Sequence, residues 1–111
     1  MSQKKSIADI EDVLVGLMGV VTATKRGEER VSTAYPYART VLAGAEGALK
    51  KLDLYEKARH AIDESERLIL AGQFDEADKL LYETAREMME RSGTNDRLRE
   101  LYAPKGSTRK Q

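Results

Sequence analysis

The chain has 111 residues, of which 41% are hydrophobic and 34% charged, and its 19 basic and 19 acidic residues leave no net charge. This composition predicts one folded domain, and the lack of net charge excludes a global attraction to nucleic acid or to an anionic membrane. The chain has no cysteine, which excludes disulfides, thiolate metal sites and a cysteine nucleophile.

The first predicted helix covers roughly residues 7–26. Ser6 and Asp9 resemble an N-terminal cap with an acidic first turn, and apolar residues then recur at helical spacing. The segment 13–21 is apolar on more than one face, which predicts a position in the middle of a bundle or of an oligomer. It is shorter than the roughly 20 residues that span a bilayer, and acidic residues interrupt the pattern of a secretory signal. We therefore expect a cytoplasmic protein.

Four glycines lie at matched positions in the first two predicted helices. If the chain folds back about a turn near residues 30–32, Gly16 lies opposite Gly47 and Gly19 lies opposite Gly44. Glycine costs roughly 0.5–1 kcal/mol in a helix interior relative to alanine. The sequence therefore predicts a tight antiparallel hairpin in which two helix backbones cross closely at these glycines.

Glycine, proline and capping residues divide the rest of the chain into four more predicted helices. We expect them at about 35–52, 53–71, 74–92 and 95–102, the last of them short. No segment alternates polar and apolar residues for long enough to form a strand. The predicted fold is all-α, an antiparallel bundle of four main helices plus a short C-terminal helix. This single domain covers residues 1–102, and a flexible basic tail covers residues 103–111.

The turn between the third and fourth predicted helices reads Ala71-Gly72-Gln73-Phe74-Asp75-Glu76-Ala77. The glycine lets the chain reverse, the aromatic ring plugs the turn, and the alanine permits a close crossing. Residues 55–90 therefore resemble a single tetratricopeptide-type helical hairpin. The resemblance implies a solitary helix pair, because a repeat array needs about three units and no second copy is present.

The same helix pair is similar to that of small prokaryotic HEPN domains, some of which are ribonucleases. Their catalytic signature is an arginine followed on the same helix by a histidine. Here no histidine follows Arg86, and His60 is the only one in the chain. The resemblance therefore implies no ribonuclease site.

Two groups of acidic side chains have the spacing of a metal or proton-transfer site. His60 lies between Glu56 and Glu64 at four-residue spacing. The second group shares one face of the next helix: Glu83, Glu87 and Glu90. We interpret both as solvated surfaces, because neither has partners converging from a facing helix. The sequence predicts no catalytic residue, metal or cofactor, with a magnesium-dependent nucleotide hydrolase as the enzyme alternative.

The apolar part of the first helix is the predicted contact surface. Its ordinary interpretation is protein core, and its functional interpretation is a face left for a second copy or a partner helix. We therefore predict a non-catalytic assembly or adaptor subunit that binds protein partners and self-associates as a homo-oligomer. The candidate interface residues are Val13, Leu14, Leu17, Met18 and Val21.

Basic residues in the connector and the tail support an alternative function. A small helical subunit of a nucleoprotein complex would use them to contact a phosphate backbone. No aromatic residue interleaves with the basic termini to stack on bases, so we favour protein partners. The candidate phosphate contacts are Lys25, Arg26, Arg30, Lys105, Arg109 and Lys110.

Overall fold

The structure of the chain is a computed structural model that describes residues 3–93. These residues form helices joined by short connections, and they contain no strand. The helices are α1 (Gln3–Lys25), α2 (Val31–Gly44), α3 (Glu46–Lys51), α4 (Tyr55–Leu70) and α5 (Phe74–Ser92). The predicted all-α fold class is therefore confirmed for this part of the chain.

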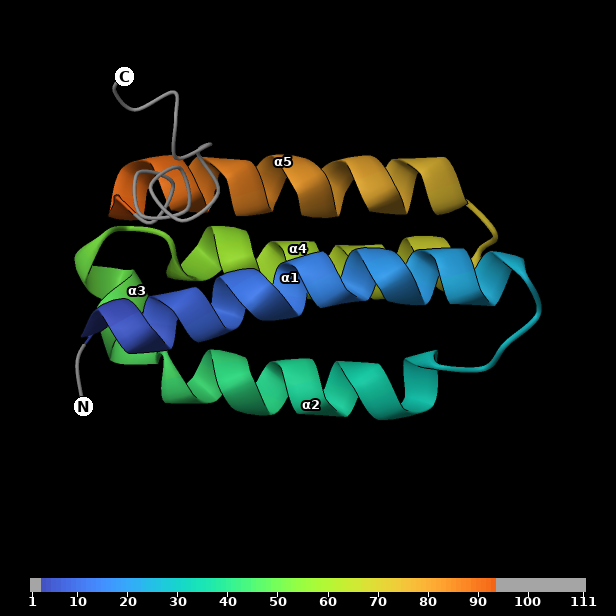
Figure 1. The fold of residues 1–111 in the computed structure, drawn as a ribbon, viewed down its shortest axis with the longest axis horizontal. Coiled ribbons are helices and arrows are strands. Elements are labelled where there is room, and N and C mark those ends of the chain that lie inside the picture. Colours follow the sequence, from blue (N-terminus) through green and yellow to red (C-terminus); the bar gives the residue numbers. More distant parts are fainter. Residues whose placement is uncertain (1–2, 94–111) are drawn as a thin grey trace, which may run out of the picture.

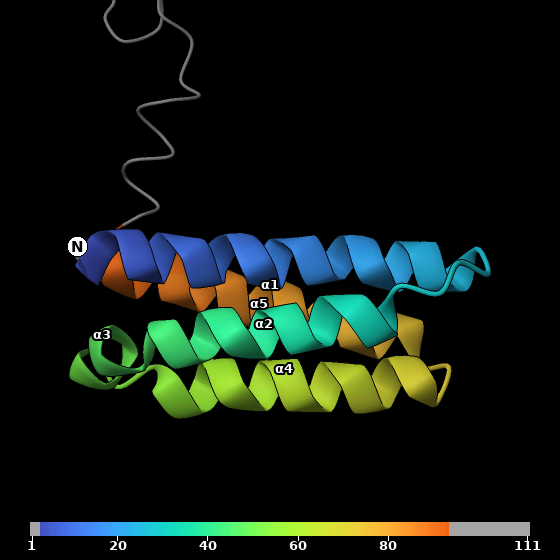
Figure 2. The ribbon, with the colours of Figure 1, turned by 90° about the horizontal axis from the view of Figure 1, so that it is seen from below.

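The four long helices lie side by side, and along the chain each runs opposite to the long helix before it (Figure 1). Helix α1 packs against α5 and α2, and α4 packs against the same two helices from the other side. The short α3 lies at one end, next to the start of α1 (Figure 1). Figure 2 shows α1 along one outer edge of the molecule. One long face of α1 therefore stays outside the helix packing.

The helix boundaries differ from the prediction mainly between residues 31 and 51. One helix was expected over about 35–52, but α2 begins at Val31 and ends at Gly44, and α3 begins at Glu46. Glycine is a weak helix former, and this segment carries two of them within four residues. The turn between α1 and α2 comes earlier than predicted, and Gly27 adopts a left-handed φ of 91° there. The expected helix 95–102 and tail 103–111 lie outside the described residues.

One hydrophobic core receives side chains from all five helices. Its α1 side is a stripe at helical spacing that includes Ile10, Leu14 and Leu17, each at most 2% exposed. Small residues also contribute to the core, and Ala77 of α5 is fully buried. The reversal between α4 and α5 is made at Gly72, whose φ of 78° favours glycine.

A buried hydroxyl pair connects α2 to α4 within this core. Tyr35 and Ser65 are both fully buried, and their hydroxyl oxygens lie 2.7 Å apart. Ser65 donates its one hydrogen to the Ile62 carbonyl at 3.2 Å, so Tyr35 is the donor to Ser65. At the surface above them, Arg39 bonds to Asp63 at 2.9 Å, which adds a second polar link between the same helices.

Replacing Tyr35 by phenylalanine removes one buried hydrogen bond and leaves Ser65 bonded to Ile62. We expect Tyr35→Phe to lower the free energy of unfolding by about 1 kcal/mol, the usual net value of such a bond. Urea unfolding followed by circular dichroism at neutral pH measures this change. An unchanged or increased stability would mean that the hydroxyl pair does not hold the helices together.

Stability should also fall at alkaline pH because of Tyr35. Burial raises the pKa of this phenol above its usual value of 10 and outweighs the lowering effect of the Ser65 hydrogen bond. The folded chain then holds the proton more tightly than the unfolded chain, so the stabilisation is complete below pH 10 and is lost as the pH rises beyond it. Unfolding curves between pH 8 and about pH 11 should show a steeper decline for the natural chain than for Tyr35→Phe. Parallel declines would contradict this assignment.

Candidate interaction surface

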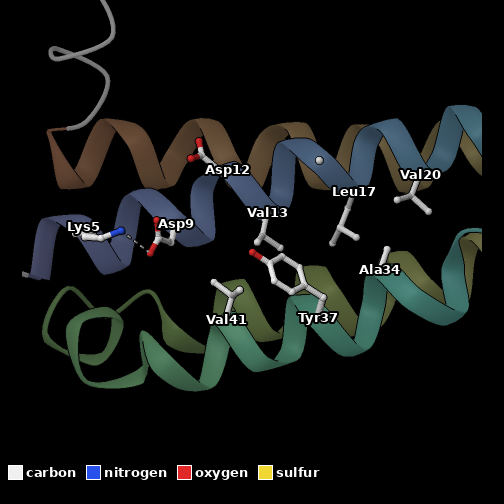
Figure 3. Close-up of a pocket in the computed structure, with 10 residues that line it drawn as sticks. Lys5, Asp9, Asp12, Val13, Leu17, Val20, Ala34, Tyr37 and Val41 are labelled. Atoms are coloured by element: carbon white, nitrogen blue, oxygen red, sulfur yellow. Dashed lines mark ion pairs between the residues drawn. The ribbon is translucent and has the colours of Figure 1, made fainter. Parts of the chain in front are cut away.

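A groove of about 580 Å³ lies along the seam between α1 and α2. Val13 and Val20 line it from α1, and Tyr37 and Val41 line it from α2. The side chains of Val13 and Tyr37 point toward each other across the seam (Figure 3). Tyr37 is 64% exposed, so most of its ring faces solvent. The seam is therefore hollow on its outer side, and its lining is mostly apolar, with charged side chains at one end: Lys5, Asp9 and Asp12.

Two smaller hollows extend this seam in both directions. One of about 280 Å³ continues from Gly16 toward Arg26 and Arg30. The other, about 260 Å³, continues from Asp9 toward Gly44. Each shares lining residues with the central hollow. We call the three together the α1–α2 groove.

The predicted close crossing of α1 and α2 at matched glycines is wrong. Gly16, Gly19, Gly44 and Gly47 are all exposed, and a Cβ built on any of them would meet nothing within 4 Å beyond its own stretch of chain. The two helices do pack in opposite directions, but through larger side chains on their inner faces. Three of the glycines, Gly16, Gly19 and Gly44, instead line the α1–α2 groove.

Most of the predicted interface residues belong to the core. Leu14, Leu17 and Val21 are at most 2% exposed, which leaves them almost no surface for a partner. Val13 is partly buried and lines the α1–α2 groove. Met18 is partly buried and lines a separate hollow between α1 and α5. Of the five predicted interface residues, Val13 and Met18 therefore keep accessible apolar surface, and they lie on opposite sides of the buried stripe.

The hollow between α1 and α5 is smaller, about 380 Å³. Val15 and Met18 line it from α1, and Tyr82 and Met89 line it from α5. Val15 is 48% exposed and Tyr82 is 52% exposed. This side of α1 carries a second apolar surface, but it has no glycine.

The predicted phosphate contacts within the described residues lie near carboxylates. Lys25 lies 3.7 Å from Asp75, and both Arg26 and Arg30 approach Glu28, at 3.9 and 3.0 Å. These pairs reduce the positive potential of the connector. The remaining candidates, Lys105, Arg109 and Lys110, lie outside the described residues.

The carboxylates near His60 bond to arginines. Glu56 accepts from Arg59 at 2.6 Å, and Glu64 accepts from Arg67. The Arg67 bond also holds the pKa of Glu64 below its usual value. Both carboxylates are therefore committed to ion pairs along their own helix.

Two of the three glutamates considered on α5 are paired as well. Glu87 lies 3.3 Å from both Lys57 and Arg91, and Glu90 lies 3.3 Å from Arg86. Desolvation raises the pKa of Glu87, but the hydrogen bonds and charges of Lys57 and Arg91 outweigh it, so the net shift is downward. Across residues 3–93, no three acidic or histidine side chains gather closely enough to hold a metal ion.

One buried carboxylate was missed from the sequence. Glu11 is 1% exposed and accepts a hydrogen bond from the Ser92 hydroxyl at 3.0 Å, which links α1 to the end of α5. Its burial could have been predicted from its position four residues after Ile7 and directly after Ile10, which places it on the inner face of α1. It therefore serves the packing of α1 on α5.

No protein-family model, curated protein or solved structure matches this chain. Within residues 3–93, no helix combines the length and the apolar character that crossing a membrane requires.

Alanine at the groove glycines should stabilise the isolated chain. A Cβ at Gly16 or Gly19 meets open space, so Gly16→Ala and Gly19→Ala gain helix propensity, and we expect each to raise the free energy of unfolding by about 0.5–1 kcal/mol. Urea unfolding at low protein concentration measures this, with Gly72→Ala as the destabilised reference because of its left-handed φ. A loss of stability at position 16 or 19 would contradict the open space above these two glycines.

Proposed function

We propose that this chain is a non-catalytic assembly subunit that binds protein partners, including copies of itself, through the α1–α2 groove. In this proposal α1, α2, α4 and α5 form an antiparallel four-helix bundle, which acts as a rigid scaffold in the cytoplasm. Helices α4 and α5 supply it with a solitary tetratricopeptide-like hairpin. The bundle presents the groove on its outer edge.

The observation that carries the proposal is the open space above the groove glycines. A glycine inside a helix costs roughly 0.5–1 kcal/mol relative to alanine. Within the described residues, no contact fills the space that a side chain at Gly16 or Gly19 would occupy. A partner helix lying in the groove would use that space, because its backbone can approach α1 closely only where side chains are small.

The walls of the groove supply apolar contact area to such a partner. Val20 and Val41 are partly buried, and the ring of Tyr37 is mostly exposed. Tyrosine and valine anchors beside a small-residue floor suit a helix that inserts one face into the groove. The basic connector gives the nucleoprotein alternative less support, because Arg26 and Arg30 already lie near Glu28.

Two measurements test this function: whether the natural chain self-associates, and whether a larger side chain in the groove weakens that self-association. We expect sedimentation of the natural chain at micromolar concentrations to show oligomers, and Gly16→Leu to raise the dissociation constant about tenfold or more through steric overlap. Gly47→Leu is the matched control, since Gly47 is exposed on α3 and does not line the groove.

Two results would overturn the proposed function. One is a natural chain that remains monomeric and captures no helical partner at these concentrations. The other is an equal effect of Gly16→Leu and Gly47→Leu, which would show that the groove has no special role. A salt-sensitive gel shift with nucleic acid would instead favour the phosphate-binding alternative.

A further inference from the structure

The outer face of α1 carries a repeat of small and charged residues at alternating spacings of three and four. Such spacing places side chains along one seam of a helix, as in a coiled coil. We call this set the outer stripe: Asp9, Asp12, Gly16, Gly19, Ala23 and Arg26. Arg26 follows the last residue of α1, but its N–H still donates to the Thr22 carbonyl, so it continues the helical turn.

The outer stripe lies on the accessible side of α1. Gly16 and Gly19 are exposed, and the side chains of Asp9 and Arg26 are 52% and 68% exposed. Asp12 is also exposed and points away from α2 (Figure 3). Ala23 is the one buried member. A second helix could therefore reach most of the stripe without any rearrangement of the core.

The centre and the two ends of the stripe are complementary when it is reversed, and between them Asp12 falls opposite Ala23. Gly16 and Gly19 are equally distant from a point between residues 17 and 18, and so are Asp9 and Arg26. Two α1 helices paired antiparallel about that point would place Gly16 against Gly19 of the second copy. The same pairing would place Asp9 against Arg26 of the second copy at both ends.

We propose that a second copy of this chain docks with its α1 antiparallel to this α1, along the outer stripe, about a two-fold axis beside Gly16 and Gly19. This inference rests on the proposed function and names its partner and geometry. Glycines at the centre let the two backbones approach closely, and opposite charges at the two ends fix the direction. An interface of this kind is isologous, because the same patch serves both copies.

Electrostatics selects the antiparallel direction over the parallel one. A parallel pairing in register would place Asp9 against Asp9 and Arg26 against Arg26, and like charges in contact repel. Within one copy, Asp9 lies 3.5 Å from Lys5 and Arg26 lies 3.9 Å from Glu28. Such exposed pairs contribute little to stability, so docking can replace them at small cost.

Charge reversal tests the pairing directly. At low salt, Asp9→Arg alone and Arg26→Glu alone should each raise the dissociation constant of self-association about tenfold, because each creates two like-charge contacts. The double variant Asp9→Arg/Arg26→Glu should restore the affinity, since it reverses both charges of each ion pair and so places opposite charges together again. Sedimentation gives the dissociation constants, and far-ultraviolet circular dichroism checks that each variant stays folded.

The matched controls lie on the exposed side of α5. Glu83→Arg and Lys79→Glu make the same changes in net charge as the two test variants, at exposed positions outside the stripe. They should leave self-association unchanged. Equal weakening by tests and controls would trace the effect to net charge and overturn the pairing.

Disulfide cross-linking tests independently whether the two α1 helices pair antiparallel. The chain has no cysteine of its own, so only introduced cysteines can form the link. An oxidised mixture of Asp9→Cys and Arg26→Cys should give a disulfide-linked pair of the two variants. Either variant alone should give far less linked dimer, because its cysteines lie at opposite ends of the antiparallel pair. Strong linkage in each single variant would overturn the antiparallel direction.

The outcomes separate this inference from the proposed function. Self-association that Gly16→Leu weakens, but that the charge variants do not change, supports the groove and overturns the α1 pairing. A natural chain that is monomeric at all concentrations tested overturns the pairing, whatever other partner the groove binds.

Discussion

The packing of α1 between α2 and α5 is the constraint on which the rest of the structure depends. Its inner stripe, including Ile10, Leu14 and Leu17, is almost fully buried and contributes to the single core. A helix turns by about 100° per residue, so a residue two positions after a buried one lies about 200° away from it. Gly16 follows Leu14 and Gly19 follows Leu17 in this way, so burying the leucines places the glycines on the outer face.

The remaining helices hold this outer face in a fixed position. The buried pair of Tyr35 and Ser65 ties α2 to α4, and Glu11 bonds to Ser92 where α1 meets α5. These polar bonds have directional requirements that apolar packing lacks, so they favour one arrangement of the helices. The wall that Tyr37 builds on α2 thereby keeps its position relative to the glycines of α1, as a preorganised binding surface requires.

Helices with a strongly periodic apolar pattern could be predicted from the sequence. The prediction of the glycine crossing failed, because it compared positions along the helix axes and did not consider which face of each helix the glycines occupy. Helices α4 and α5 were predicted closely, because a clear apolar stripe and the turn at Gly72 define them. The four glycines were matched by depth along the helices but not by face, since equal depth does not fix the rotation of a helix about its axis. The same omission assigned Leu14 to an interface, although it continues the buried stripe of Ile7 and Ile10. The charge relation between Asp9 and Arg26 became visible only once their exposure was known.

The central claim is that the outer face of α1 is the surface through which this chain assembles. A dilution series of amide nuclear magnetic resonance spectra tests it most directly, because each backbone N–H reports its own surroundings. The account predicts concentration-dependent shifts at Asp9, Gly16, Gly19 and the neighbouring Tyr37, with Lys79 on α5 unchanged. Spectra that do not depend on concentration, or shifts centred on α5, would contradict it.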